Sequence, residues 1–282
     1  APCIPDTANS PNIDDTPAIQ ATLQRCGING SISIPAGSVY NIHTPIDFSP
    51  CHFCLFQLEG TLNISNTASE WHGKPAVLHF PSVQGARVVS NTGTGLINGN
   101  GVGGSEKFAP MVNITSGSST LVFRNFRIID PIGTFFDLDG ANSEIEFVGL
   151  SLGWSETPAT IPSLLDGFSI ANTTGVKIWR TAIDKTRSCV NLQNGIADTL
   201  VGDTSCNASH GGVWFDVEFQ RTANMEQTAS NVSIRNVTIA HTDTAIGIRA
   251  ANTGTFTATN VTWEDIHLDT VNSWQEITSC IG

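Results

Sequence analysis

An eight-residue pattern recurs along the chain, with apolar residues at its first, third, sixth and eighth positions. The clear copies occupy 121–128, 145–152, 232–239 and 261–268, and weaker copies occupy 176–183 and 199–206. Alternation with a period of two predicts β-strands that bury one face, and the two-residue break predicts a corner between two short strands. Successive copies start 23 to 33 residues apart, a spacing typical of a solenoid built from stacked turns.

No helical pattern separates these copies, which indicates that each turn of the solenoid pairs with the turns above and below it. Asn125, Asn236 and Asn260 stand at the predicted corners, where asparagine tolerates a left-handed backbone. An antiparallel sandwich is the main alternative, but regular Asn-Gly or Asp-Gly hairpins between the copies are missing. We therefore predict an all-β, single-domain, right-handed parallel β-helix over residues 1–282.

A short amphipathic helix is predicted over residues 14–27. Thr16 is expected to cap it, Pro17 fits its first position, and Gly27 can end it. Three residues share one face of this helix: Ile19, Leu23 and Cys26. Such a helix would cover the open end of the solenoid, which otherwise presents an unpaired sheet edge.

The composition of the 282 residues narrows the functional classes. Charged residues make up 13% of the chain and the net charge is −12, which argues against nucleic-acid binding because that function needs a basic face. No apolar run approaches the ~20 residues that span a membrane. The chain opens with Ala1, Pro2 and Cys3, without a Met or an apolar leader, which predicts a mature secreted protein. We expect a monomer.

Seven cysteines and eight Asn-x-Ser/Thr sequons also predict the secretory pathway. The candidate glycosylation sites are Asn29, Asn63, Asn113, Asn172, Asn207, Asn231, Asn236 and Asn260. Some of these sequons arise by chance in a chain this rich in Asn, Ser and Thr.

The cysteines predict disulfides rather than a metal site. Cys3 is expected to pair with Cys26, which would tie the N-terminal strand to the helix. Cys51 and Cys54 have no second pair of thiols to complete a zinc site, so a disulfide is the better explanation. Because seven is odd, the set Cys51, Cys54 and Cys280 contains the unpaired thiol. No metal and no cofactor are expected.

Short fragments along the chain resemble one known family. Residues 14–19 read DDTPAI, 34–37 read IPAG, 95–101 read GLINGNG, 165–168 read LDGF and 209–211 read SHG. In this order they resemble glycoside hydrolase family 28, the polygalacturonases and rhamnogalacturonan hydrolases, over nearly the whole chain. The resemblance implies the pectin-lyase-like β-helix fold. It also implies a disulfide between two cysteines on successive turns, Cys189 and Cys206.

The family carries four active-site motifs, Asn-Thr-Asp, Asp-Asp, Gly-His-Gly and Arg-Ile-Lys, and its three aspartates carry out inverting hydrolysis. Asp166 matches the first aspartate, and His210 matches the histidine. Arg187 and Ser188 stand where the family has its Asp-Asp pair, so its general acid and one water-activating carboxylate are missing. The lysine of the last motif falls on Arg249.

These departures rule out assembling the family's mechanism from the matching positions. Inverting hydrolysis needs two carboxyl groups across the scissile bond, and an arginine, with a pKa above ~12, cannot donate a proton usefully. The resemblance implies that Asp166 and His210 belong to the catalytic site. Asp216 and Glu218 are our candidates for a relocated acid.

Basic side chains suggest a lining for an acidic glycan. Lys185 and Arg187 alternate on one predicted strand face, and alternation can point Arg249 into the same groove. The arginine of the last family motif falls on Gly247. Three tryptophans fit either sugar stacking or core packing: Trp154, Trp179 and Trp214.

We therefore expect a secreted hydrolase of pectic polysaccharide, galacturonan or rhamnogalacturonan, with a rearranged acid–base site. Its expected partner is an acidic, uronate-containing polysaccharide of the plant cell wall. Any activity is expected to depend on Asp166. Two alternatives stay open. One is a catalytically inactive relative that binds glycan in the groove. The other is a polysaccharide lyase, for which basic and imidazole side chains are suitable although no lyase motif is visible.

Overall fold

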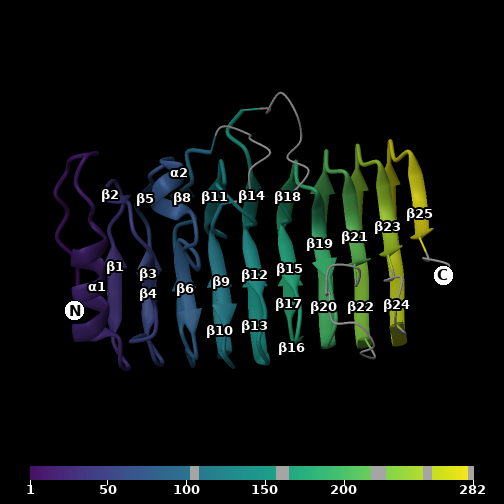
Figure 1. Cartoon of the computed structure of the whole chain (residues 1–282), viewed down its shortest axis with the longest axis horizontal. Helices are drawn as coiled ribbons and strands as arrows, with labels where there is room; N and C mark the ends of the chain where they lie inside the picture. Colours follow the sequence, from purple (N-terminus) through teal and green to yellow (C-terminus); the bar gives the residue numbers. More distant parts are fainter. Residues whose placement is uncertain (102–107, 157–164, 217–226, 250–255, 279–282) are drawn as a thin grey trace.

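The computed structural model describes residues 1–101, 108–156, 165–216, 227–249 and 256–278. This part of the chain forms a parallel β-helix whose axis runs from the N-terminal to the C-terminal end (Figure 1). Each turn, called a rung below, adds two strand segments to a 16-stranded first sheet and one strand to a nine-stranded second sheet. The strand pairs in both sheets are parallel.

The first sheet has two faces that meet at a corner. The first face contains β1 (Ser31–Ile34), β4 (Leu55–Leu58), β7 (Arg87–Val89), β10 (Ser119–Arg124), β13 (Asn142–Val148), β16 (Thr173–Thr174) and β17 (Lys177–Trp179). The second face contains β2 (Val39–Ile42), β5 (Thr61–Ile64), β8 (Leu96–Asn98), β11 (Arg127–Ile129), β14 (Ser151–Gly153) and β18 (Ala182–Asp184). Three long strands run through the corner and serve both faces: β20 (Ile196–Asn207), β22 (Gln227–Ala240) and β24 (Phe256–Asp269).

The second sheet follows the second face along the chain. It contains β3 (Ile46–Asp47), β6 (Leu78–Pro81), β9 (Val112–Thr115), β12 (Phe136–Leu138), β15 (Phe168–Ile170), β19 (Ser188–Leu192), β21 (Gly211–Asp216), β23 (Thr244–Arg249) and β25 (Ser273–Thr278). Two helices, α1 (Thr16–Cys26) and α2 (Ala68–Trp71), lie among the first rungs (Figure 1).

The six octets stack in register, as the sequence pattern predicted. Leu121 lies opposite Ile145, and Thr199 lies opposite Val232, which in turn lies opposite Val261. Because every copy occupies the same place in its rung, their apolar residues form continuous rows inside the solenoid. The prediction of a parallel β-helix is confirmed.

The corners of the octets have the predicted backbone conformation. Asn125 and Asn236 stand at octet corners with φ angles of 60° and 51°, in the left-handed region that asparagine tolerates. Asn260, with a φ of 52°, lies instead just before its octet, beside Asn231, and the corner of that octet is Asp265. The Asn125 side chain also donates a hydrogen bond to the carbonyl of Ser90 on the preceding rung, at 2.9 Å. The corner therefore both turns the chain and ties one rung to the next.

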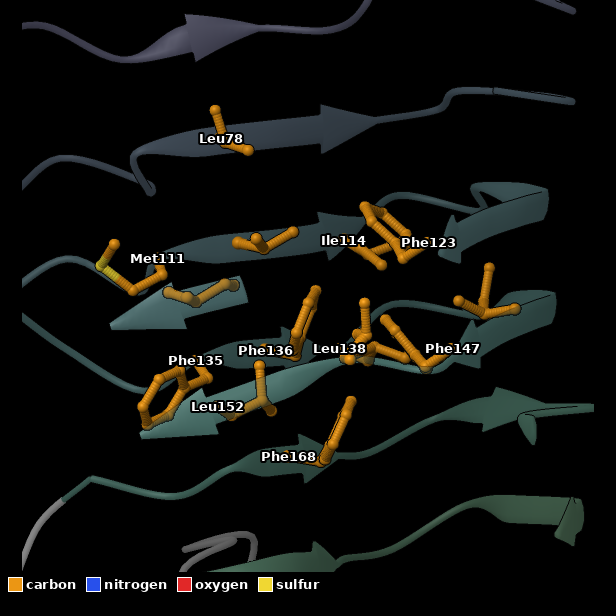
Figure 2. Packing of buried hydrophobic residues seen from close by; sticks show 14 of the residues in the cluster. Leu78, Met111, Ile114, Phe123, Phe135, Phe136, Leu138, Phe147, Leu152 and Phe168 are labelled. Carbon is orange, nitrogen blue, oxygen red and sulfur yellow. The ribbon is translucent and has the colours of Figure 1, made fainter. Parts of the chain in front are cut away.

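Aromatic side chains fill the space between the first face and the second sheet (Figure 2). Phe123 stacks on Phe147 with ring centroids 5.2 Å apart, and Phe136 stacks on Phe168 at 5.1 Å. Edge contacts such as Phe123 with Phe136, at 5.6 Å, join the two stacks across the core. These contacts place the outer surfaces of the first face and of the second sheet on opposite sides of the solenoid.

Helix α1 lies within the predicted span, but its N-terminus differs from the prediction. Asp15 is the N-cap and makes no side-chain cap bond, because its carboxylate accepts hydrogen bonds from the backbone N–H groups of Ala8 and Asn41. Thr16 is already helical, and its hydroxyl donates to the carbonyl of Thr44 at 3.0 Å. The expected Thr16 cap is therefore wrong, whereas the expected end at Gly27 is confirmed.

Three disulfides are present in the described residues: Cys3–Cys26, Cys51–Cys54 and Cys189–Cys206. The first and third are the pairs expected from the sequence. The remaining cysteine, Cys280, lies outside the described residues.

Sequon accessibility differs from site to site. Seven of the eight sequon asparagines are exposed or half-buried, but Asn113 is buried and donates to the carbonyl of Asp137. Burial argues against a glycan at Asn113. Among the described helices, none is long and apolar enough to cross a membrane.

Candidate active site

The turns that lead into the second sheet place three of the predicted residues close together. Asp166 precedes β15, Arg187 immediately precedes β19, and His210 immediately precedes β21. The backbone N–H of Gly211 donates to the carbonyl of Arg187 at 2.7 Å. The parallel register therefore sets Arg187 and His210 side by side on neighbouring rungs.

Asp166 is held by a bidentate ion pair. Its side chain is buried, and its two oxygens accept hydrogen bonds from Nε and Nη2 of Arg187 at 2.9 and 2.6 Å. The amide of Asn191, on β19, donates to the same carboxylate at 3.1 Å. Fork-like pairing of this kind fixes both partners strongly. Both Asp166 oxygens therefore already accept hydrogen bonds, which limits the ability of this carboxylate to activate a water. The sequence did not reveal this pairing.

The charge on Arg187 is reinforced by its surroundings. Burial disfavours the charged guanidinium, but the hydrogen bond and negative charge of Asp166, together with the charge of Asp216, raise the pKa of Arg187 above its usual value. Arg187 is thus a fixed positive charge. It offers no proton to a leaving group.

His210 belongs to a second polar cluster, on the exposed rim. Its Nδ1 lies 2.9 Å from an oxygen of Asp243, whose other oxygen accepts a hydrogen bond from Asn272 at 3.0 Å. The three residues occupy equivalent positions on successive rungs. An imidazole oriented by a carboxylate is a common arrangement for proton transfer.

Trp214, on β21, packs against the neighbouring strand β23 of the second sheet. It is 7% exposed, and its ring occupies the space that a Cβ on Gly211 or Gly247 would take, 2.0 to 2.1 Å from the nearest ring atom. The guanidinium carbon of Arg249 lies 5.0 Å from the ring centroid. Gly211 and Gly247 therefore make room for this indole.

Asp216 ends β21 beside Arg249, which ends β23. The two residues are register partners, and Nη1 of Arg249 lies 3.3 Å from Oδ2 of Asp216. The Asp216 side chain is 4% exposed, whereas that of Arg249 is 33% exposed. The site thus contains a second buried carboxylate whose cationic neighbour reaches the surface.

A pocket of about 80 Å³ joins these groups. Its lining comprises Arg187, Ser188, His210, Gly211, Trp214, Asp216 and Arg249. Four residues that the sequence singled out, Arg187, His210, Asp216 and Arg249, therefore meet at one pocket, and Asp166 contacts it through Arg187. Glu218, the other candidate acid, lies outside the described residues.

Lys185 does not join this pocket. It lies in the turn between β18 and β19 with φ at 57°, and its ammonium group is 3.3 Å from the carboxylate of Asp184. The expectation that Lys185 and Arg187 alternate on one strand face is wrong, because β19 begins only at Ser188. The turn directs the two basic side chains to different partners.

A larger groove of about 720 Å³ runs along the earlier rungs, beside the ends of the second-face strands. Trp154 lines it and donates from Nε1 to the carbonyl of Lys185 at 3.1 Å. A ladder of asparagine amides also lines it: Asn63 donates to Asn41, and Asn100 donates to Asn63. The sequence pattern did not single out this groove.

Asp243 is the main site residue that sequence reasoning missed. It follows His210 by 33 residues, the same step that separates the octets at 199 and 232. Applying that step to the turn would have placed Asp243 beside His210. Among the described residues, no group of three or more His, Cys, Asp or Glu is arranged to hold a metal ion.

The family model for glycosyl hydrolases family 28 matches residues 27–277. A protein of Aspergillus flavus named probable endo-xylogalacturonan hydrolase A is 31% identical over 293 aligned residues, covering 100% of this chain and 71% of the relative. The endo-xylogalacturonan hydrolase A of Aspergillus tubingensis is 28% identical, with the same coverage.

Solved structures agree with these relatives. The crystal structure of the Aspergillus tubingensis endo-xylogalacturonan hydrolase superposes with a TM-score of 0.92 at 27% identity, covering 100% of this chain and 78% of that one. The polygalacturonase of Erwinia carotovora, with a TM-score of 0.64 at 14% identity and coverages of 99% and 94%, shares the fold. By the extent of the family match and the identity to its relatives, the chain belongs to the glycosyl hydrolases family 28.

Proposed function

We propose that this chain hydrolyses a uronate-bearing pectic polysaccharide through an acid–base site that differs from that of its family. The observation that carries the proposal is the pocket where Asp216 and His210, two proton-transferring groups, meet two arginines. The names of its relatives make a xylose-substituted galacturonan a natural member of the substrate panel. Three disulfides fit work outside the cell, and we infer a secreted monomer.

Arg249 is the proposed anchor for a uronate carboxylate. The Arg249 side chain is 33% exposed and its guanidinium carbon lies 5.0 Å from the centroid of the Trp214 ring, so an anion in the pocket can approach the guanidinium from solvent. Charge-assisted bonds between arginine and carboxylate are short and strong. Arg187 lines the same pocket and keeps its positive charge, which favours the same anionic substrate.

The proposed chemistry divides one hydrolysis between two side chains. His210, in its protonated form and oriented by Asp243, gives its proton to the glycosidic oxygen as the bond from that oxygen to the anomeric carbon breaks. Asp216 takes a proton from the water whose oxygen forms the new bond to the anomeric carbon. The reaction leaves His210 neutral and Asp216 protonated, and exchange with solvent restores both.

Asp166 has a positioning role in this proposal. Its carboxylate holds the guanidinium of Arg187 against the pocket, so it acts on the substrate through that residue. Any activity should therefore still depend on Asp166, as the family resemblance implied, although Asp166 itself does not activate water.

Replacing Asp216 by asparagine tests the proposal. Asp216→Asn keeps the size of the side chain but removes its ability to accept a proton, so the rate should fall about 10²–10⁴-fold with little change in oligosaccharide binding. The measurement is reducing-end release from polygalacturonate, rhamnogalacturonan and xylogalacturonan, with the absorbance of unsaturated products followed in parallel. Asp265→Asn, the same change at an exposed corner of β24, is the control and should keep full activity.

Binding without turnover is the second candidate function, and the Asp166–Arg187 pair favours it. The ion pair engages both oxygens of Asp166, the carboxylate that the family resemblance assigned to the catalytic site. Tight oligogalacturonate binding by the wild type, with no release from any pectic polymer, would assign this function and overturn the hydrolytic one. Hydrolysis at an unchanged rate by Asp216→Asn would show that Asp216 is not the base. Unsaturated products would instead identify a lyase.

A further inference from the structure

A second groove lies on the outer surface of the first face, on the opposite side of the solenoid from the candidate active site. It has a volume of about 570 Å³ and crosses the rungs of β10, β13, β17, β20 and β22. Its lining comprises Arg124, Glu146, Val148, Lys177, Trp179, Arg180, Leu200 and Arg235. None of these residues takes part in the site described above.

The groove concentrates positive charge in an acidic protein. Four of the chain's 13 lysines and arginines line it against one carboxylate, that of Glu146, although the whole chain carries a net charge of −12. All four are exposed, and in the described part of the chain none forms an ion pair with a carboxylate. Glu264, the register neighbour of Arg235 on β24, is not joined to it by an ion pair either. A local field of this sign attracts anions despite the net charge.

Trp179 contributes an aromatic ring to the lining of the groove. Its ring lies over Gly202, its register partner on β20, where a Cβ would come within 2.2 Å of the ring. The guanidinium carbon of Arg235, one rung further, lies 5.3 Å from the ring centroid. An arginine stacked in this way keeps the edge of its donor fork available for a carboxylate. The glycine and the tryptophan thus hold Arg235 ready for an anionic group.

The spacing of the cations suits a linear polyanion. Arg124 and Arg235 are separated by four rungs, from β10 through β13, β17 and β20 to β22. At about 4.8 Å per rung the separation is about 19 Å. Lys177 and Arg180 lie between them. Positive groups repeated along this direction, beside an aromatic ring, match a polymer that alternates sugar rings and carboxylates.

We propose that this groove, residues Arg124, Lys177, Trp179, Arg180 and Arg235, is a second, non-catalytic binding site for a polyuronate strand. Only the choice of a pectic uronate as the occupant rests on the proposed function; the charge and shape of the groove stand independently of it. The site would keep the protein attached to an acidic polysaccharide while the opposite face remains open to another strand.

Calorimetry with a galacturonate oligomer tests the proposal, because the number of bound oligomers separates the two sites. The wild type should bind two oligomers. Arg124→Gln/Arg235→Gln should weaken one of the two by at least about tenfold, as expected for losing charged contacts. Arg249→Gln should weaken the other. The matched control Lys74→Gln/Arg127→Gln removes two exposed positive charges outside the groove and should leave both sites intact.

Each outcome decides between the alternatives. Loss of one site in the groove variant alone supports the proposal, even if Arg249→Gln shows no effect and the proposed function fails. Unchanged binding by the groove variant overturns it, as does an equal loss in the control variant, which would indicate an unspecific charge effect. A polyglutamate peptide that bound the groove as tightly as the galacturonate oligomer would overturn the assignment to a glycan.

Discussion

At the scale of single residues, Glu59 shows how a turn holds a buried carboxylate. It lies in the turn after β4 and accepts hydrogen bonds from the Ser90 hydroxyl at 2.8 Å and the Asn91 N–H at 2.6 Å. Thr92 donates to it through both its N–H and its hydroxyl. Burial disfavours the charged form, but these donors outweigh burial and hold the pKa of Glu59 at about 2, below its ordinary 4.5.

This environment predicts a pH-dependent contribution to stability. Because the folded-state pKa of Glu59 is lower than the unfolded one, the contribution is fully present above about pH 4.5 and is lost as the pH falls toward about 2. Glu59→Gln should lower the free energy of unfolding by about 2–3 kcal/mol near neutral pH. Urea unfolding from pH 7 to pH 2.5 measures both effects. A wild type and variant whose difference stayed constant across this range would contradict the account.

The site residues show what their sequence positions could and could not predict. Asp166, Arg187, His210, Asp216 and Arg249 were singled out from the family resemblance and its departures, and the structure brings them together. Their closeness could be expected, because residues one repeat apart in the sequence become neighbours on successive rungs of a β-helix. The engagement of Asp166 was not predictable, since it depends on the direction in which the Arg187 side chain leaves its turn. The predicted alternation of Lys185 with Arg187 was wrong because Lys185 lies in a turn, whose side-chain directions the strand pattern does not give.

At the scale of elements, the corner between two strands of a rung is the unit that repeats. The octets and their register could be predicted from the sequence because their apolar residues form buried rows, which impose a regular pattern on the chain. The N-cap of α1 could not be predicted in this way, because the carboxylates of Asp14 and Asp15, and not the hydroxyl of Thr16, accept hydrogen bonds from backbone N–H groups in this region. The Asp15 carboxylate accepts hydrogen bonds from the backbone N–H groups of Ala8, seven residues before it, and Asn41, 26 residues after it. The Asp14 carboxylate accepts one from the N–H of Thr16.

The corner residue Asn125 offers a test of this unit. Its φ of 60° is strained for a residue with an ordinary side chain, and its amide holds the carbonyl of Ser90. Asn125→Ala should lower the free energy of unfolding by about 2–3 kcal/mol, from backbone strain of about 1–2 and one lost hydrogen bond. Asn125→Gly, which loses the hydrogen bond but accepts the conformation, should cost less. Chemical denaturation of the two variants measures the difference; equal losses would refute the role of the backbone.

At the scale of the whole molecule, each rung is stabilised by the rungs on either side of it. Ile239, in the octet at 232–239, is buried beneath the next rung. Its register partner Leu268 on β24 is 42% exposed, because no described strand packs on the other side of β24. The hydrophobic core runs through the described rungs from α1 to β23, and the Phe123–Phe147 and Phe136–Phe168 stacks lie in the middle ones. The two proposed binding surfaces, the pocket on the second sheet and the groove on the first face, lie on opposite sides of that core.

We propose that substrate is bound and cleaved at the pocket formed by His210, Asp216 and Arg249, while Asp166 stays paired with Arg187. A crystal structure of Asp216→Asn with a bound galacturonate oligomer tests it most directly. We expect a uronate carboxylate on Arg249, a glycosidic oxygen within hydrogen-bond reach of His210, and an intact Asp166–Arg187 pair. An oligomer that placed its glycosidic bond against Asp166, with Arg187 displaced, would contradict it.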